Sequence, residues 1–352
     1  MQKCQVVFCR ALTTAEMKIL LVQTSFLGDT ILSTPVISGI KRLYPAADLW
    51  VMTTPLASKL VVRDPLVSGV LAYDKRGKES RLSGLLRMKG RIKAMAFDRV
   101  YSLHRSFRTS ILLWLCGIPV RIGYENARLN FLYHKTRKRN AKDHNVIRDL
   151  SLLSGEIPIE SLETDLRLFA PARNELDKEI ISSLPQPGSY VVLVPGSAWE
   201  TKMWDWRGYR KVARFLLRRG LDVVLLGGSP DTEVSAKVAG GTQVIDLTGK
   251  TDIAETMYIV KNARLIACND SMALHMASAF KVPNVAIFCA TSPQFGFGPW
   301  KNRTVVVEKK DLACRPCRRH GGRSCPTGTE ACMKDLSPDE VIGAIKGLLN
   351  IE

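Results

Sequence analysis

The chain has 352 residues, 46% of them hydrophobic, and a formal net charge of +18. This length predicts two domains, and the hydrophobic content is sufficient for a core in each. No run of about 20 apolar residues occurs, which argues against a transmembrane helix. Residues 1–16 lack the apolar stretch and small-residue cleavage site of a signal peptide, so they are interpreted as a dispensable extension before Met17.

Strand-like and helix-like segments alternate along the first half of the chain. Strands are predicted at 18–23, 47–52, 69–73, 99–103 and 119–123, and helices at 31–44, 82–94 and 106–116. Such alternation indicates a parallel sheet with helices on both faces.

A second series follows a segment rich in Pro, Glu and Ser (155–188), which is interpreted as an interdomain linker. Its strands are predicted at 190–194, 222–226, 243–246, 265–268, 285–288 and 304–307, and its helices at 206–219, 253–263, 271–279 and 338–349. The sequence therefore predicts an α/β protein with two Rossmann-like, doubly wound parallel-sheet domains that face a central cleft. The domains are expected over 17–175 and 176–336, with a C-terminal helix in 337–352.

Positive charge is concentrated in the first predicted domain. Residues 75–142 carry 18 Lys and Arg against 3 Asp and Glu. This imbalance indicates an anionic partner, either a nucleic acid, a phospholipid surface or a phosphorylated substrate. The alternative is a surface that is merely solvated.

The first predicted strand leads into Gly28 and Asp29, within VQTSFLGDTILSTP (22–35). Ligands of doubly wound sheets bind beyond the carboxyl ends of the strands, where this turn is expected. A glycine and an aspartate at this place are compatible with a phosphate-binding turn, a helix cap or a reacting group.

Two turns in the second half have a composition suited to phosphate. Ser197 follows one strand in a turn with a proline and a glycine, and Lys202 supplies a positive charge before the next helix. Asp270 and Ser271 follow another strand, where either can cap the helix that begins there, and His275 lies on the same helix face as Ser271. The alternatives are an ordinary connection, a plain N-cap and a core histidine.

Two further segments are weaker candidates. Asp231 and Glu233 open a helix after a strand, where a carboxylate can bind ribose hydroxyls, although favourable pairing with the helix dipole is the simpler explanation. The Gly/Pro-rich loop in 286–300 is expected to form a cleft wall or a structural turn.

Four of the nine cysteines cluster near the C-terminus with the spacing C-x2-C-x7-C-x6-C. The first pair has zinc-knuckle spacing, whereas the other gaps are irregular. The interpretations are a structural zinc site, reduced thiols in a surface loop, or disulfides formed on isolation, and the reduced loop is favoured. These residues are Cys314, Cys317, Cys325 and Cys332.

Four ordered motifs resemble the lipopolysaccharide heptosyltransferases of glycosyltransferase family 9, and most closely the type that adds the second inner-core heptose. They are KILLVQTSFLGDTILSTPVISGIKRLYP, PGSAWETKMWDWRGY, NDSMALHMASA and ATSP…FGP, and the match covers nearly all of 17–350. The resemblance implies a two-domain GT-B fold. It also implies transfer of L-glycero-D-manno-heptose from ADP-heptose to a lipid A-core acceptor.

The resemblance also implies roles for individual residues. Asp29 becomes the catalytic base of a single, inverting displacement, and Lys202 stabilises the departing diphosphate. The first domain binds the acceptor and the second binds the donor. The implied donor-site residues are Ser197, Lys202, Glu233 near the ribose, Thr251 near the adenine, Asp270, Ser271 and His275. No D-x-D motif occurs, so neither a metal nor another cofactor is expected to be required.

The same resemblance implies a function for the basic residues of the first domain. Gly28, Arg105 and Arg108 are expected to meet the phosphorylated lipid A-core acceptor. The segment KTRKRNAK (135–142) is expected to meet anionic headgroups at the cytoplasmic face of the inner membrane. The protein is accordingly expected in the cytoplasm, peripheral to that membrane.

Two alternatives remain at this stage. The family usually reads Asp-Ser-Gly or Asp-Thr-Gly, whereas Met272 follows Ser271 here, so a related glycosyltransferase with another nucleotide-sugar donor stays open. A nucleic-acid-binding protein is disfavoured, because the basic residues are not interleaved with stacking aromatics and two Rossmann-like halves are unneeded.

Overall fold

The computed structural model describes residues 17–352, which form two six-stranded sheets. The first contains Lys18–Val22 (β1), Asp48–Thr53 (β2), Gly69–Ala72 (β3), Arg99–Ser102 (β4), Val120–Tyr124 (β5) and Lys135–Arg137 (β6). The second contains Tyr190–Val194 (β7), Asp222–Leu225 (β8), Ile245–Asp246 (β9), Leu265–Asn269 (β10), Asn284–Phe288 (β11) and Thr304–Glu308 (β12). The extension predicted at 1–16 lies outside the described residues.

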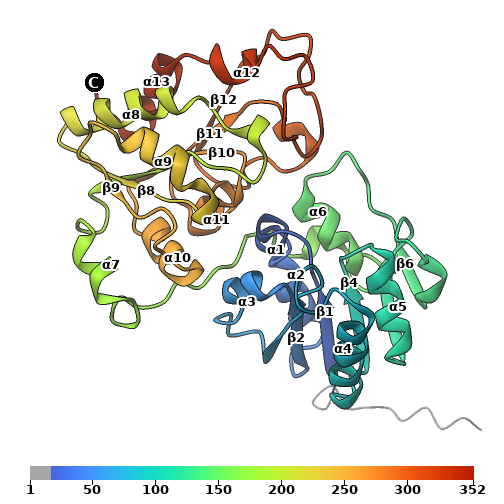
Figure 1. Ribbon diagram of the computed structural model, residues 1–352. Helices are drawn as coiled ribbons and strands as arrows, with labels where there is room; N and C mark the ends of the chain where they lie inside the picture. Colours follow the sequence, from blue (N-terminus) through green and yellow to red (C-terminus); the bar gives the residue numbers. More distant parts are fainter. Residues whose placement is uncertain (1–16) are drawn as a thin grey trace, which may run out of the picture.

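All strand pairs run parallel, and each sheet reverses its strand order in the middle. The orders are β3-β2-β1-β4-β5-β6 and β12-β11-β10-β7-β8-β9 (Figure 1). The predicted α/β class with two doubly wound sheets is confirmed, and all eleven predicted strands are present. The sequence missed β6, because its three residues Lys-Thr-Arg have no apolar pattern and pair only at the sheet edge.

The helices of the first half are Leu27–Leu32 (α1), Pro35–Leu43 (α2), Pro55–Val61 (α3), Leu82–Ala94 (α4), Phe107–Leu115 (α5) and Asn145–Leu150 (α6). Those of the second are Lys178–Ser183 (α7), Trp206–Arg218 (α8), Thr232–Ala239 (α9), Ile253–Lys261 (α10), Met272–Phe280 (α11), Ala331–Lys334 (α12) and Pro338–Leu349 (α13).

The single helix predicted over 31–44 is wrong, because two helices occupy this stretch. The hydroxyl groups of Ser33 and Thr34 donate to carbonyls of α1 at 2.9 and 2.7 Å. Pro35 then lacks an N–H and can occupy only the first turn of a new helix. The helix also begins earlier than predicted, so that Gly28 and Asp29 lie inside α1 rather than in a turn before it.

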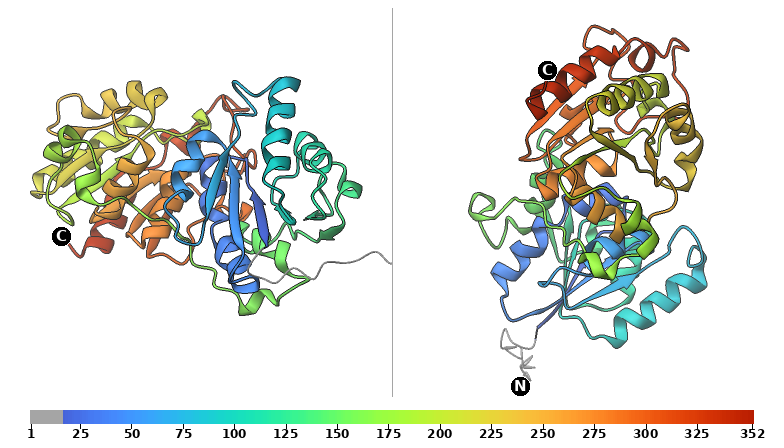
Figure 2. Two further views of the ribbon diagram at one scale, coloured as in Figure 1. Left: turned by 90° about the horizontal axis from the view of Figure 1, so that it is seen from below. Right: turned by 90° about the vertical axis from the view of Figure 1, so that its left-hand side faces the viewer.

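Helices cover both faces of each sheet (Figure 2). In the first sheet, α4 and α5 pack on one face, and α1, α2, α3 and α6 pack on the other. In the second sheet, α8 and α13 pack on one face, and α10 and α11 pack on the other. The core cluster beneath α1 and α2 also contains residues of α10 and α11, so the two halves share one apolar core. Among residues 17–352, no helix is both long and apolar enough to cross a membrane.

A second connection between the halves, here called the domain joint, consists of α6 and the loop 291–300. The backbone N–H of Asn145 donates to the Gly296 carbonyl at 2.8 Å, and Arg148 Nη1 donates to the Phe295 carbonyl at 2.9 Å. Gly296 has φ = +91°, and a Cβ there would lie 2.8 Å from the Arg148 guanidinium. Only glycine therefore suits this position.

The domain joint leads to a stability prediction. Arg148 is fully buried and also donates to the carbonyls of Asn140 and Ala141. Arg148→Met keeps much of the volume but leaves these acceptors without a donor, at about 1–3 kcal/mol for each buried group. We expect the free energy of unfolding to fall by about 2–4 kcal/mol in urea titrations. Arg87→Met, at an exposed position of α4, is the control and should change the free energy of unfolding by less than about 0.5 kcal/mol. Equal effects of the two substitutions would contradict a stabilising role of the Arg148 hydrogen bonds.

Candidate active site

A cleft of about 1730 Å³ lies between the carboxyl edges of the two sheets and is lined by residues from both halves. It brings together ten of the eleven residues singled out from the sequence as catalytic, donor-binding or acceptor-binding. They are Gly28, Asp29, Arg105, Ser197, Lys202, Glu233, Thr251, Asp270, Ser271 and His275.

Asp29 is the third residue of α1 and is partly buried in the cleft wall. Its Oδ2 accepts from the backbone N–H of Phe26 at 3.2 Å, so the carboxylate also satisfies the helix start. Burial raises the pKa of Asp29, whereas the Phe26 hydrogen bond and the charges of His320, Arg139 and Lys202 act in the opposite direction. A carboxylate with a raised pKa is a stronger base than a free aspartate.

Gly28 lies against His275 across the interface between the halves. A Cβ on Gly28 would be 2.9 Å from the His275 ring, closer than carbon atoms normally approach. His275 is buried, and burial lowers its pKa to about 4, so the ring is neutral at pH 7. The contact lets α1 and α11 pack closely and fixes how near Asp29 comes to the second sheet.

The donor candidates meet around Asp270. Lys202 Nζ lies 2.7 Å from Asp270 Oδ2, and Thr291 Oγ1 donates to the same oxygen at 2.7 Å. Ser197 Oγ lies 3.4 Å from the Asp270 carbonyl oxygen. Lys202 is thus held by a buried carboxylate and aimed into the cleft.

The helix start at α11 differs from the predicted cap. Ser271 occupies the N-cap position, but neither its side chain nor that of Asp270 caps the helix. In residues 17–352, the buried Ser271 Oγ has no hydrogen-bond partner. The first-turn N–H groups of a helix have no partner within the helix, and Ser271, Met272 and Ala273 at this helix start line the cleft. Free donors at a helix start can bind an anion.

Glu233 and Thr251 line the far end of the cleft. Glu233 is exposed and its Oε1 lies 2.5 Å from Lys237 Nζ, and Thr251 Oγ1 lies 3.1 Å from Thr256 Oγ1. Asp231, next to them, accepts from the Gly228 N–H at 2.8 Å. This end presents carboxylates and hydroxyls, and its ion pair between Glu233 and Lys237 is exposed.

Arg105 and Arg108 were both predicted to contact the acceptor, but only one of them lines the cleft. Arg105 lines the cleft. Arg108 does not, because its guanidinium donates to the Tyr73 hydroxyl at 2.7 Å and to backbone carbonyls of residues 79–81. Arg108 therefore holds the loop before α4 instead of facing the cleft, where an acceptor would bind.

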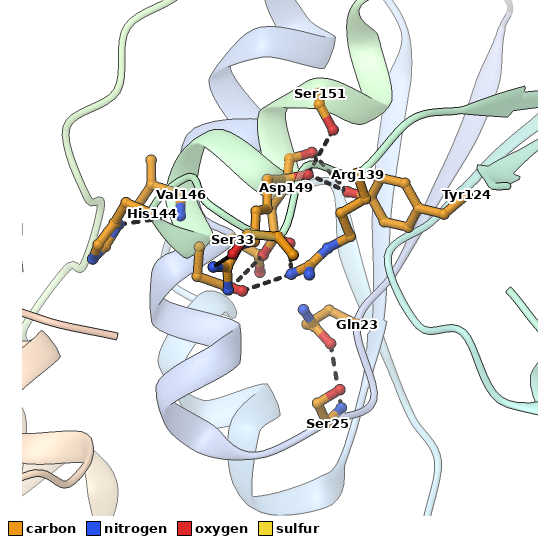
Figure 3. Close-up of polar contacts among 12 residues, drawn as sticks. Gln23, Ser25, Ser33, Tyr124, Arg139, His144, Val146, Asp149 and Ser151 are labelled. Carbon is orange, nitrogen blue, oxygen red and sulfur yellow. Dashed lines mark hydrogen bonds and ion pairs between the residues drawn. The ribbon is translucent and has the colours of Figure 1, made fainter. Parts of the chain in front are cut away.

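Sequence reasoning missed a polar cluster on the first-domain wall (Figure 3). Arg139 Nη2 donates to Asn145 Oδ1 at 2.6 Å and lies 3.2 Å from Asp149 Oδ1. Burial raises the pKa of Asp149 to about 7 despite Arg139, and the charge of Asp29 adds to the rise. Arg139 belongs to the basic segment 135–142 that was interpreted as a membrane contact, but its side chain turns inward. No pattern in the sequence distinguishes it from its neighbours.

A family model described as glycosyltransferase family 9 (heptosyltransferase) matches residues 85–326. The chain belongs to this family. Lipooligosaccharide heptosyltransferase 2 of Campylobacter jejuni is 24% identical over 94% of this chain and 99% of its own. Lipopolysaccharide heptosyltransferase 2 of Salmonella typhimurium is 23% identical over 96% and 99%. The chain is therefore a glycosyltransferase.

Solved structures agree with the family in fold. A family 9 glycosyltransferase from Veillonella parvula superposes with a TM-score of 0.84 at 23% identity, covering 95% of this chain and 97% of its own. ADP-heptose lps heptosyltransferase II of E. coli gives 0.76 at 22% identity, covering 95% and 99%. The GT-B architecture expected from the motifs is confirmed.

The four terminal cysteines are free thiols in the part of the chain that the structure describes. Within residues 17–352, no group of three or more His, Cys, Asp or Glu side chains is arranged to hold a metal ion, so the zinc interpretation of Cys314, Cys317, Cys325 and Cys332 finds no support in the geometry. The loop between the cysteines nevertheless matters, because Arg319 and His320 extend from it into the cleft.

The Gly28 contact gives a second prediction. Gly→Ala inside a helix normally stabilises by about 0.5–1 kcal/mol, but in Gly28→Ala the new methyl group meets His275. We expect the free energy of unfolding to fall, and His275→Ala added to Gly28→Ala to recover part of the loss. Gly90→Ala in α4 is the control, since nothing lies within 4 Å of its Cβ position and it should stabilise. Stabilisation by Gly28→Ala would contradict the contact.

Proposed function

We propose that this family 9 enzyme transfers L-glycero-D-manno-heptose from ADP-heptose to the inner core of lipopolysaccharide, with inversion at the anomeric carbon. One observation carries the proposal: Asp29, on α1 beside the first sheet, lines the same cleft as Lys202 and the start of α11, which lie beside the second sheet. A base and a diphosphate site on opposite walls are what a single displacement on a nucleotide sugar requires. The printed names of the relatives support the sugar and the acceptor.

The donor is proposed to lie along the second sheet. Its diphosphate would accept hydrogen bonds from the first turn of α11, Ser271 and Ser197, and would share the charge of Lys202 with Asp270. Glu233 and Thr251, which line the same cleft, are proposed to lie near the ribose and the adenine. The residues that bind the diphosphate also stabilise the charge that it gains as the C–O bond breaks.

The acceptor hydroxyl is proposed to transfer its proton to Asp29 while its oxygen attacks the anomeric carbon. The new C–O bond forms on the face opposite the departing ADP, so the configuration inverts. Arg105 and Arg139 stand on the Asp29 side of the cleft and would bind acidic groups of the acceptor. We further propose that the enzyme works in the cytoplasm, at the inner face of the inner membrane, where it would meet a lipid-linked acceptor.

One observation favours a second candidate. Met272 is the first residue of α11 and lines the cleft at the proposed diphosphate site. A glycine there would leave more room for the phosphates. The alternative is therefore a related glycosyltransferase of cell-surface glycan synthesis that uses another nucleotide sugar.

The base assignment predicts a defined kinetic loss. Asp29→Asn keeps an oxygen that can accept from Phe26 but cannot remove a proton, so kcat should fall by about 10²–10⁴. ADP affinity, measured by calorimetry, should change less than threefold. The active form of Asp29 is ionised and its pKa is raised above 3.8, so kcat/KM of the wild type should fall as pH decreases, with the acidic limb above that value. Unchanged turnover in Asp29→Asn would refute the base.

The donor assignment predicts selective binding. In a thermal-shift panel, ADP-heptose should raise Tm more than UDP- or GDP-sugars, and Lys202→Gln should weaken ADP-heptose binding at least tenfold. Lys211→Gln, on the exposed side of α8, is the matched control. A larger shift with a UDP- or GDP-sugar would favour the alternative donor.

A further inference from the structure

The exposed large hydrophobic side chains are unevenly distributed over the described residues. Of nine such side chains, eight belong to the first half, and five belong to α4, α5 and the short 3-10 helix Asn130–Leu132 (η1). We call these five the apolar face: Leu82, Leu86, Phe107, Trp114 and Phe131, with exposed fractions of 70%, 50%, 51%, 51% and 76%. So many exposed apolar side chains together indicate an interaction surface.

The three elements lie side by side on one face of the first sheet. Figure 2 shows α4 and α5 next to each other, away from the second sheet. Arg108 of α5 donates to the carbonyls of residues 79–81 just before α4. Ser110 of α5 donates to the Arg128 carbonyl beside η1 at 2.6 Å. Leu82 and Leu86 are one turn apart, so they share the outer side of α4.

The charges around the apolar face are almost all positive. Within α4 lie four cations and no acidic residue, and Glu79 is the only acidic residue in 75–95. The exposed cations of this region are Arg76, Lys78, Arg81, Arg87, Arg91, Lys93 and Arg128. Apolar side chains among unpaired cations match the chemistry of an anionic phospholipid surface, which accepts both.

We propose that the apolar face docks on an anionic lipid bilayer. The bilayer is favoured over a protein partner because the cations extend along the whole of α4 without the mixed signs common at protein interfaces. The proposal rests on the proposed function only in taking the acceptor to be lipid-linked. It assigns the membrane contact to α4, α5 and η1 rather than to the segment 135–142.

The orientation that results suits a lipid-linked acceptor. Leu82 and Phe107 are the first residues of α4 and α5, which follow the carboxyl ends of β3 and β4. Residues 103–106, just before Phe107, line the cleft, as does Arg76. Docking through the apolar face therefore places the first-domain side of the cleft opening close to the bilayer. The sugar of a lipid anchored in the bilayer can then enter the cleft.

The test is cosedimentation of the full chain with vesicles of phosphatidylglycerol and phosphatidylethanolamine, compared with vesicles of phosphatidylcholine. We expect binding to the anionic vesicles only, weakened by salt. Leu82→Ser/Leu86→Ser/Phe131→Ser should lower the partition coefficient at least tenfold. Val62→Ser/Val305→Ser, which removes exposed apolar side chains elsewhere, should leave it within twofold. Equal loss in both variants, or none in the first, overturns the proposal.

A charge variant keeps the proposal testable if the triple variant folds poorly. Arg87→Gln/Arg91→Gln removes two exposed cations of α4, and each loss should cost about fivefold in partition, the equivalent of about 1 kcal/mol. Unchanged partition of this variant overturns the proposal. A second outcome would also overturn the proposal. If the wild type is a dimer in the absence of lipid and Leu82→Ser/Leu86→Ser converts it to a monomer, the apolar face is a subunit interface.

Activity separates this proposal from the proposed function. On a delipidated, water-soluble acceptor, the variants of the apolar face should keep the wild-type kcat/KM within threefold and lose rate only on acceptor embedded in vesicles. Normal docking without heptose transfer would refute the proposed function alone. Normal rates of the variants on the embedded acceptor would refute the docking face alone.

Discussion

The approach of α1 to α11 is the constraint on which the site depends. Asp29 is useful only if the second sheet comes within reach of it, and this distance is set where Gly28 meets the His275 ring. A side chain at Gly28 would press on the buried His275 ring and so push the two helices apart. The glycine of this motif is therefore a packing residue between domains, and the aspartate beside it is positioned by the same contact.

In the proposed donor site, the Lys202–Asp270 pair would orient a cation before the diphosphate binds. Asp270 Oδ2 lies 2.7 Å from Lys202 Nζ and holds the ammonium group in the cleft, and Thr291 Oγ1 donates to the same carboxylate oxygen. A diphosphate arriving at α11 would meet a cation that is already oriented, so little reorganisation is needed as the leaving group gains charge.

The sequence was sufficient for the parts of the fold that local patterns determine. Buried strands such as β7 and β10 read as continuous apolar runs, and α4 and α13 were predicted with their observed ends. Prediction from the sequence failed where a residue distant in the chain determines the direction of a side chain. Arg139 cannot be told from the exposed basic residues around it, because its inward direction depends on Asn145 and Asp149. The break before Pro35 was predictable, since helices rarely continue through proline.

The domain joint connects the two walls of the cleft through a short series of contacts. Asn145 uses its side chain to hold Arg139 and Asp149, and its backbone N–H to bind the Gly296 carbonyl of the loop 291–300. The same loop begins at Thr291, which donates to Asp270 beside Lys202. If the proposed donor binds beside Lys202, a shift of this loop would be passed to α6 and so to Arg139. The proposed donor and acceptor sites are therefore linked by the loop and a series of hydrogen bonds.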